Sequence, residues 1–164
     1  MQKPIPIVKQ EIMLVGIKTR TNNRDESSFE KGKIFPCVQR YFHQRLFDAI
    51  LNRKNPGTTF CAYTDYESDH TGDYTYFIGE EVNSLTNVPA GMESLKIPPQ
   101  HYAKFTAGPG SMPSVLTEAW QEIWELSDTN LGGKRRYGID FEIYDERALD
   151  HNKIIFDIYI GLQS

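Results

Sequence analysis

The sequence predicts a single α+β domain over residues 1–164, built from two successive β-α-β-β modules with antiparallel sheets. The order strand, helix, strand, strand can be read twice along the chain, and internal repetition of this kind constrains the whole fold. The last predicted strand of each half contains a similar stretch ending in glycine, Tyr76–Gly79 and Ile158–Gly161. Proline and glycine punctuate the region between the halves, so we place module one at about 1–88 and module two at about 89–164.

Module one begins with a short apolar run, residues 12–17, which is typical of a buried strand. Gly16 within it indicates a bulge or a close approach of two backbones. Residues 37–53 predict a helix, because apolar side chains recur there at steps of three and four. These side chains are Val38, Phe42, Leu46, Ala49 and Ile50. Residues 58–66 and 74–82 are rich in Thr, Phe and Tyr and predict an antiparallel hairpin.

Module two repeats this order after the prolines. Residues 101–107 predict a strand, and a helix follows to about Leu126, with Ser111 or Ser114 as its cap. Its apolar stripe consists of Leu116, Ala119, Trp120 and Ile123. Residues 136–145 and 153–161 predict a second strand pair. The simplest arrangement is two helix-backed sheets related by a pseudo-twofold axis, with a central groove at their junction, where small-molecule sites tend to occur.

Composition narrows the classes of function. The formal net charge is -4 and the only basic run is Lys134–Arg136, which we interpret as a solvated loop, so direct nucleic-acid binding is not expected. No apolar run approaches about 18 residues and no signal peptide is evident, so no membrane association is predicted. Two cysteines without metal-ligand spacing fit a reducing, cytoplasmic location.

Neither a metal nor another cofactor is predicted. The four histidines lack metal-ligand spacing, and the chain contains no Walker A loop, no G-x-G-x-x-G and no G-x-S-x-G. Cys37 and Cys61 have no obvious activating partner, which argues against nucleophilic catalysis by either thiol.

Glu142 is the most informative single residue, since it interrupts an otherwise apolar strand. Alternation places Asp140, Glu142 and Tyr144 on one face. An acid at such a position faces solvent or lines a polar cavity. In an aromatic cleft, a carboxylate would favour a cationic ligand, or with a raised pKa it could serve as a general acid or base.

Other side chains are candidates for the same cleft. Asp157 and Tyr159 share a face of the last strand and would neighbour Glu142 if the two strands pair in the expected register. Trp120 and Trp124 lie one helical turn apart, and either core packing or a wall of the cleft accounts for them. Tyrosine is frequent in strands in any case, so a tyrosine there is a weaker signal than the acid.

Six short motifs occur in order along nearly the whole chain. They are Tyr63–Tyr66, Asp73–Tyr76, Pro89–Met92, Tyr102–Phe105, Ala119-Trp120 with Ile123-Trp124, and Asp140–Tyr144. Their order and spacing resemble the GyrI-like, or effector-binding, superfamily, which includes domains of AraC-type and MerR-type regulators. The resemblance implies a tandem pair of strand–helix–strand–strand modules that binds lipophilic, often cationic, compounds.

The resemblance also implies roles for particular residues. Glu142 corresponds to the acid tied to ligand binding, with Tyr144 and Tyr63 as aromatic neighbours and Trp120 and Tyr159 as further contacts. The first predicted strand starts close to Met1 and leaves no room for a DNA-binding helix-turn-helix, so a stand-alone member is expected. Such members resemble drug-sequestering proteins, modulators of DNA gyrase, or hydrolases of cyclopropane-containing genotoxins.

Three functions therefore follow as alternatives. The first is a small-molecule binding domain that senses or sequesters a lipophilic drug or toxin, cationic ones included, in transcription-linked regulation. The second is a hydrolase that adds water to a strained electrophile and uses Glu142 as its catalytic group. The third is a protein-binding modulator of DNA gyrase, and a separate regulator could also be a partner.

Overall fold

A computed structural model describes residues 2–164, which form one antiparallel sheet of eight strands with helices beside it. The strand order is β1-β6-β8-β7-β3-β4-β2-β5. The strands are β1 Ile5–Lys9, β2 Ile12–Asn22, β3 Thr59–Thr64, β4 Asp73–Glu81, β5 Glu93–Ile97, β6 Gln100–Gly110, β7 Asp140–Tyr144 and β8 Ile154–Leu162. The α-helices are α1 Asn23–Glu26, α2 Ile34–His43, α3 Ser114–Glu125 and α4 Asp128–Leu131, and short 3-10 turns lie at Leu46–Ala49 and Glu146–Ala148.

The sheet is continuous across the middle of the chain. Strands β3 and β7 pair directly, with Cys61 opposite Glu142 and Ala62 opposite Phe141. The α+β class and the antiparallel pairing are confirmed, but the expectation of two separate sheets is wrong, because this pairing joins both halves into one sheet. The tandem duplication and the pseudo-twofold axis stay predictions.

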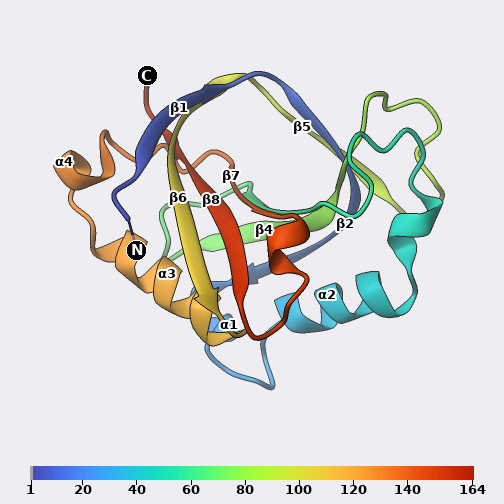
Figure 1. The fold of residues 1–164 in the computed structure, drawn as a ribbon, viewed down its shortest axis with the longest axis horizontal. Helices are drawn as coiled ribbons and strands as arrows, with labels where there is room; N and C mark the ends of the chain where they lie inside the picture. Colours follow the sequence, from blue (N-terminus) through green and yellow to red (C-terminus); the bar gives the residue numbers. More distant parts are fainter. Residues whose placement is uncertain (1) are drawn as a thin grey trace.

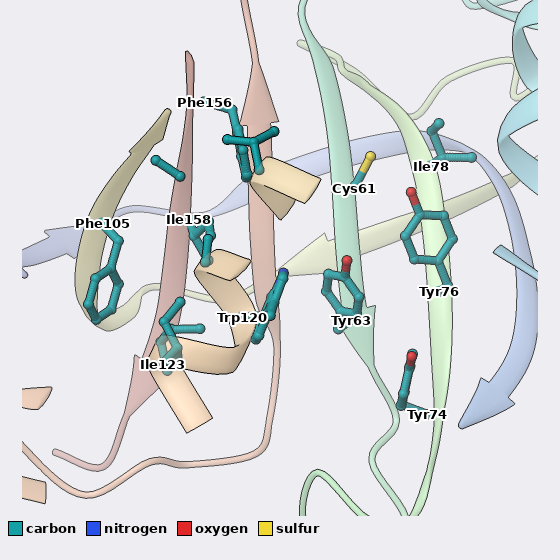
Figure 2. Close-up of a cluster of buried hydrophobic side chains, with 14 of the residues drawn as sticks. Cys61, Tyr63, Tyr74, Tyr76, Ile78, Phe105, Trp120, Ile123, Phe156 and Ile158 are labelled. Carbon is teal, nitrogen blue, oxygen red and sulfur yellow. The ribbon is translucent and has the colours of Figure 1, made fainter. Parts of the chain in front are cut away.

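The sheet is strongly curved, with α2 and α3 along one face and β1 and β5 at its two edges (Figure 1). Alternation along each strand separates two apolar cores. The core on the helix side contains Ile78, Phe105 and Ile158 (Figure 2), whereas Phe77 and Phe141 belong to the core on the other face. Both faces of the central strands are therefore buried, which explains their nearly continuous apolar and aromatic character.

Two strands were not predicted, and both lie at sheet edges. Strand β1 pairs only with β6, and its Pro6 is tolerated because an edge strand has one row of unpaired backbone groups. Strand β5 pairs only with β2, and three of its five residues, Glu93, Ser94 and Lys96, are polar or charged. Short, half-polar edge strands carry little of the signal that reveals a central strand.

The first predicted helix is shorter than expected. Helix α2 begins at Ile34, with Pro36 in its first turn, and ends at His43. Arg45 adopts the left-handed conformation (φ 48°), which stops the helix and begins the 3-10 turn. Because the helix presents a slightly rotated face, Tyr41 is fully buried whereas Phe42 is 47% exposed.

Candidate functional site

A pocket of about 280 Å³ opens between helix α3 and strands β3 and β4, with α1 closing its far side. Tyrosine and tryptophan side chains form much of its wall. Its lining residues are Asn23, Glu26, Ser27, Ile34, Tyr63, Tyr66, His70, Tyr74, Leu116, Thr117, Trp120, Gln121, Trp124 and Arg135. Helix α3 supplies Trp120 because its apolar stripe turns this residue towards the sheet, where only 8% of it is exposed.

Glu142 lies directly behind this aromatic wall and is only 1% exposed. Its Oε2 accepts hydrogen bonds from the Tyr63 hydroxyl at 2.5 Å and from the Trp120 indole nitrogen at 2.7 Å. Its Oε1 accepts from the Tyr144 hydroxyl at 2.7 Å. Four of the five predicted site residues are therefore assembled into one hydrogen-bonded cluster, although they come from β3, α3 and β7.

Burial dominates the electrostatics of this cluster. Loss of hydration raises the pKa of the Glu142 carboxyl above its ordinary value, and the hydrogen bonds from Tyr63, Tyr144 and Trp120 offset part of that rise. Burial, together with the nearby Glu142 carboxylate, also raises the pKa of Tyr63 and of Tyr144 well above the usual range. Both phenols therefore keep their protons and act as donors to the carboxylate.

Aromatic rings continue from the cluster into the pocket. Trp120 meets the edge of Tyr63 with 5.0 Å between ring centroids, and Tyr63 lies 5.7 Å from Tyr74 (Figure 2). Trp124 follows Trp120 at 6.3 Å and is 38% exposed, so it lies at the outer end of the pocket. This series of rings offers apolar faces at several orientations to a ligand that enters from solvent.

Tyr159 is not part of the cluster. Strands β7 and β8 pair so that Glu142 is opposite Ile158, while Tyr159 is opposite Phe141. Tyr159 consequently lies on the other face of the sheet, stacked on Phe141 with 4.7 Å between centroids. The expected register, which would have placed Asp157 and Tyr159 beside Glu142, is wrong by one residue, and one residue changes the face.

A buried ion pair between Arg135 and Asp140 supports the pocket from one end. Asp140 is fully buried and accepts hydrogen bonds from Arg135 at 2.9 Å, from the Tyr66 hydroxyl at 2.6 Å and from the Gly161 amide at 2.7 Å. The Arg135 guanidinium lies 4.3 Å from the centroid of the Tyr137 ring. The interpretation of Lys134–Arg136 as a solvated loop is thus wrong for Arg135, whose side chain is 10% exposed. The sequence held one signal for this pairing. Asp140 lies in a predicted strand five residues after Arg135, and a buried carboxylate needs a cation.

Asp140→Asn is expected to destabilise the protein by about 3–5 kcal/mol, because it leaves the buried Arg135 charge without its partner. Urea unfolding followed by circular dichroism measures the change. Glu125→Gln, which removes an exposed carboxylate from helix α3, serves as the control and should change stability by less than about 0.5 kcal/mol. Equal, small effects of both substitutions would contradict a structural role for the ion pair.

Within residues 2–164, no group of three or more His, Cys, Asp or Glu side chains has an arrangement that could hold a metal ion. Over the same residues, no helix is both long and apolar enough to cross a membrane.

Comparison with known proteins places the chain in a class of effector-binding proteins. The family described as integron-associated effector binding protein, Cass2, matches residues 7–162. The chain therefore belongs to this family.

Two regulators share sequence with the chain. The putative transcriptional regulator protein YobU of Bacillus subtilis (strain 168) is 27% identical over 149 residues, covering 90% of each chain. The transcriptional regulator BrlR of Pseudomonas aeruginosa (strain PAO1) is 37% identical over 94 residues, which are 56% of this chain and 34% of BrlR.

Solved structures share the fold. The integron cassette protein VCH_CASS2, from the mobile metagenome of Vibrio cholerae, has a TM-score of 0.75 at 23% identity, covering 99% of this chain and 97% of that one. SAV2435 bound to tetraphenylphosphonium has a TM-score of 0.78 at 18% identity, covering 99% and 95%.

Proposed function

We propose that the chain binds a lipophilic organic compound, cationic ones included, in the aromatic pocket, and that binding serves sensing or sequestration in transcription-linked regulation. The observation that carries this proposal is the buried Glu142 carboxylate, held behind the pocket wall by Tyr63, Trp120 and Tyr144. Glu142, Tyr63 and Trp120 are the proposed ligand-recognition residues, and Tyr144 orients the carboxylate.

The cluster suits a planar or propeller-shaped ligand with delocalised positive charge. Aromatic faces attract cations by about 0.5–2 kcal/mol each, more when water is excluded. Because Tyr63 and Trp120 both donate to Glu142, their rings become more electron-rich and carry part of the carboxylate's negative charge towards the pocket. The carboxylate itself stays behind the rings, which favours weakly hydrated organic cations over small, strongly hydrated ones.

The relatives support this reading. One structural neighbour is described with tetraphenylphosphonium bound, and the sequence relatives are named as transcriptional regulators. The aromatic pocket is lined by residues from both halves of the chain, among them Tyr63 and Trp120. The predicted partners, a separate regulator and DNA gyrase, stay predictions, as does the absence of direct nucleic-acid binding.

Tetraphenylphosphonium is expected to bind the chain saturably, at one per protein, and to quench the fluorescence of Trp120. Tyr63→Leu should weaken binding about tenfold, because it removes both a ring of the wall and a donor to Glu142. Tyr159→Phe is the control and should bind as the unchanged protein does, since Tyr159 lies on the opposite face. Titration calorimetry measures both. Absence of binding, or an equal loss in the two variants, would refute the proposed site.

The hydrolase is a second candidate, favoured by the raised pKa of Glu142. Because Glu142 lies behind the pocket wall, its proton would reach the ligand through the Tyr63 hydroxyl, which lines the pocket and is hydrogen-bonded to it. A cyclopropane C–C bond would break as its carbon takes this proton, water would form the new C–O bond, and the proton that water loses would return to the carboxylate. Incubation with cyclopropane-bearing electrophiles and mass spectrometry of the ligand distinguishes the two functions. A ligand heavier by one water, over many turnovers, indicates a hydrolase, and an unchanged ligand indicates a binding protein.

A further inference from the structure

The aromatic pocket has an acid on its wall, and this acid is not Glu142. Glu26, in the short helix α1, is the one carboxylate among the described residues that line the pocket, since Glu142 lies behind the wall. Asn23, in the same helix, accepts a hydrogen bond from the Tyr74 hydroxyl at 3.0 Å. Burial, and after it the charge of Glu26, raise the pKa of Tyr74. A polar edge with a negative charge therefore borders the rings on the α1 side.

The carboxylate of Glu26 is held in place by neutral donors. Its Oε2 accepts hydrogen bonds from the Thr21 hydroxyl at 2.5 Å and from the Lys33 backbone amide at 2.7 Å. Its Oε1 accepts one from the Ile34 backbone amide at 3.2 Å. A carboxylate has about four acceptor sites, so Oε1 still has room for a further donor. None of the three donors carries a charge that would cancel that of the carboxylate.

No cation in the described part of the chain pairs with Glu26. Within residues 2–164, no Lys, Arg or His side-chain nitrogen lies within 4.0 Å of its carboxylate oxygens. Arg24 and Lys33, the basic residues next to it in sequence, are exposed, where water and salt screen their charge. His70 lines the same pocket, but its ring stacks on Trp124 with 6.0 Å between centroids. A cationic ligand would therefore meet an acid that has no ionic partner of its own.

The basic group on the wall, Arg135, lies away from α1. Its guanidinium lies 5.8 Å from the centroid of the Tyr66 ring, which in turn lies 5.9 Å from Tyr74, the ring bound to α1. Two rings thus separate this charge from α1, and Asp140 already pairs with it at 2.9 Å. The pocket therefore has an acidic end at α1 and a basic end whose charge is compensated, which gives a polar ligand a preferred orientation.

We propose that Glu26 is a specificity-determining residue of this pocket, which accepts a hydrogen bond from a protonated amine of the ligand. The inference rests on the function proposed above and narrows its ligand class to lipophilic compounds that carry both an aromatic body and an ammonium group. The aromatic body would cover Tyr63 and Trp120, and the ammonium would point towards α1.

The two acids would then have different roles. Glu142 acts on any cation through the rings of the wall, because its carboxylate stays behind them. Glu26 distinguishes cations that donate an N–H group from those, such as tetraphenylphosphonium, that have none. Charge-assisted hydrogen bonds to a carboxylate are about twice as strong as neutral ones, so this distinction is large enough to measure.

Matched pairs of phosphonium cations test the role of Glu26. The pairs are (3-aminopropyl)- with butyltriphenylphosphonium and (5-aminopentyl)- with hexyltriphenylphosphonium, in which an ammonium replaces a methyl group of similar size. Titration calorimetry gives the ratio of the two affinities within each pair. In Glu26→Gln this ratio should shift about tenfold against the amine in at least one pair, because the charge-assisted bond is lost. The affinity for the alkyl cations should change by less than about threefold, since they make no such bond.

Glu30→Gln is the control, because it removes the same charge from an exposed residue of the turn after α1, outside the pocket wall. Both ratios should stay unchanged in this variant, and Glu142→Gln should weaken the two members of a pair alike. Equal ratios in Glu26→Gln and Glu30→Gln, with the alkyl cations still bound, would overturn the role of Glu26 alone. Failure of all four cations to bind the unchanged chain would instead refute the proposed function, and this inference with it.

A measurement on the unchanged chain avoids any effect of the substitution on folding. Nuclear Overhauser contacts from the methylene group beside the ammonium are expected to reach residues 23–27 of the isotope-labelled protein. Contacts of that methylene with Tyr66 and Arg135 instead, at the other end of the pocket, would contradict the orientation and so the proposal.

Discussion

Glu142→Gln is expected to weaken tetraphenylphosphonium binding about tenfold or more, and to leave the affinity for a neutral analogue such as triphenylmethanol nearly unchanged. The carboxylate lies in a buried, weakly screening environment, so its negative charge acts on a cation across the Tyr63 and Trp120 rings. Glutamine keeps the shape of the side chain and removes that charge. Calorimetric titration of both ligands measures the difference, and Glu125→Gln on the surface of α3 is the matched control.

The same carboxylate makes cation binding dependent on pH. Loss of hydration raises the pKa of Glu142 above its ordinary value, so the group keeps its proton to higher pH than a solvated glutamate does. Tetraphenylphosphonium affinity should therefore rise with pH through the pKa of Glu142, and the profile should become flat in Glu142→Gln. A pH dependence that persists in the variant would show that another group controls binding.

The stability of the fold depends on the ionisation of Glu142 in the opposite direction from cation affinity: it falls as pH rises. The pKa of Glu142 is higher in the folded than in the unfolded protein. Its contribution to the free energy of unfolding is therefore fully present below the unfolded pKa and is lost as pH rises through the folded pKa. Ionisation of Glu142 therefore costs stability as pH rises, and glutamine avoids that cost while its carbonyl oxygen can still accept from Tyr63 and Trp120 and its amide can donate to the Tyr144 hydroxyl. For this reason Glu142→Gln should remain folded, and thermal unfolding of the variant tests whether its binding loss belongs to the site.

Gly16→Ala is expected to destabilise the protein by at least about 3 kcal/mol or to prevent folding. Gly16 on β2 lies opposite Gly79 on β4, and a Cβ at residue 16 would lie only 1.9 Å from the Ile78 carbonyl oxygen. The obstacle is backbone, which cannot rotate away as a side chain can. The close backbone approach predicted from Gly16 is thus confirmed.

Gly138→Ala is the control for this prediction. A Cβ at residue 138 would first meet the Arg136 side chain at 3.4 Å, an ordinary contact with a flexible group. Its cost should stay below about 1 kcal/mol. Urea unfolding measures both variants, and a Gly16→Ala protein as stable as Gly138→Ala would show that β2 and β4 can separate without loss.

Sequence patterns were sufficient to predict the central strands and to single out Glu142. Strand segments such as β3 and β4 are rich in aromatic residues, and Glu142 is conspicuous because it interrupts an apolar strand. Trp120 lay on the predicted apolar stripe of α3, but only the resemblance to the effector-binding superfamily proposed it as a ligand contact. Local periodicity reports which face of an element is apolar, and it does not report which elements meet.

Long-range register was beyond local patterns. Tyr159 was misplaced because the β7–β8 pairing differs by one residue from the expected one, and nothing in either strand specifies that offset. Arg135 was missed because a run of cations on a loop is usually solvated, whereas here Asp140 draws one of them inside. The joining of both halves into one sheet depends on the β3–β7 contact, between residues about eighty positions apart.

Each edge strand pairs with a strand from the other half of the chain. Strand β1 comes from the first half of the chain but pairs with β6, and β5 follows the first half but pairs with β2 (Figure 1). A chain cut near residue 88 would leave each fragment with one strand, β1 or β5, whose only partner is on the other fragment, and it would also separate β3 from β7. Neither fragment would then be complete by itself, yet the two together would hold all the pairings needed for complementation. Because β8 is the last strand to be synthesised, the sheet cannot be completed until the whole chain has emerged.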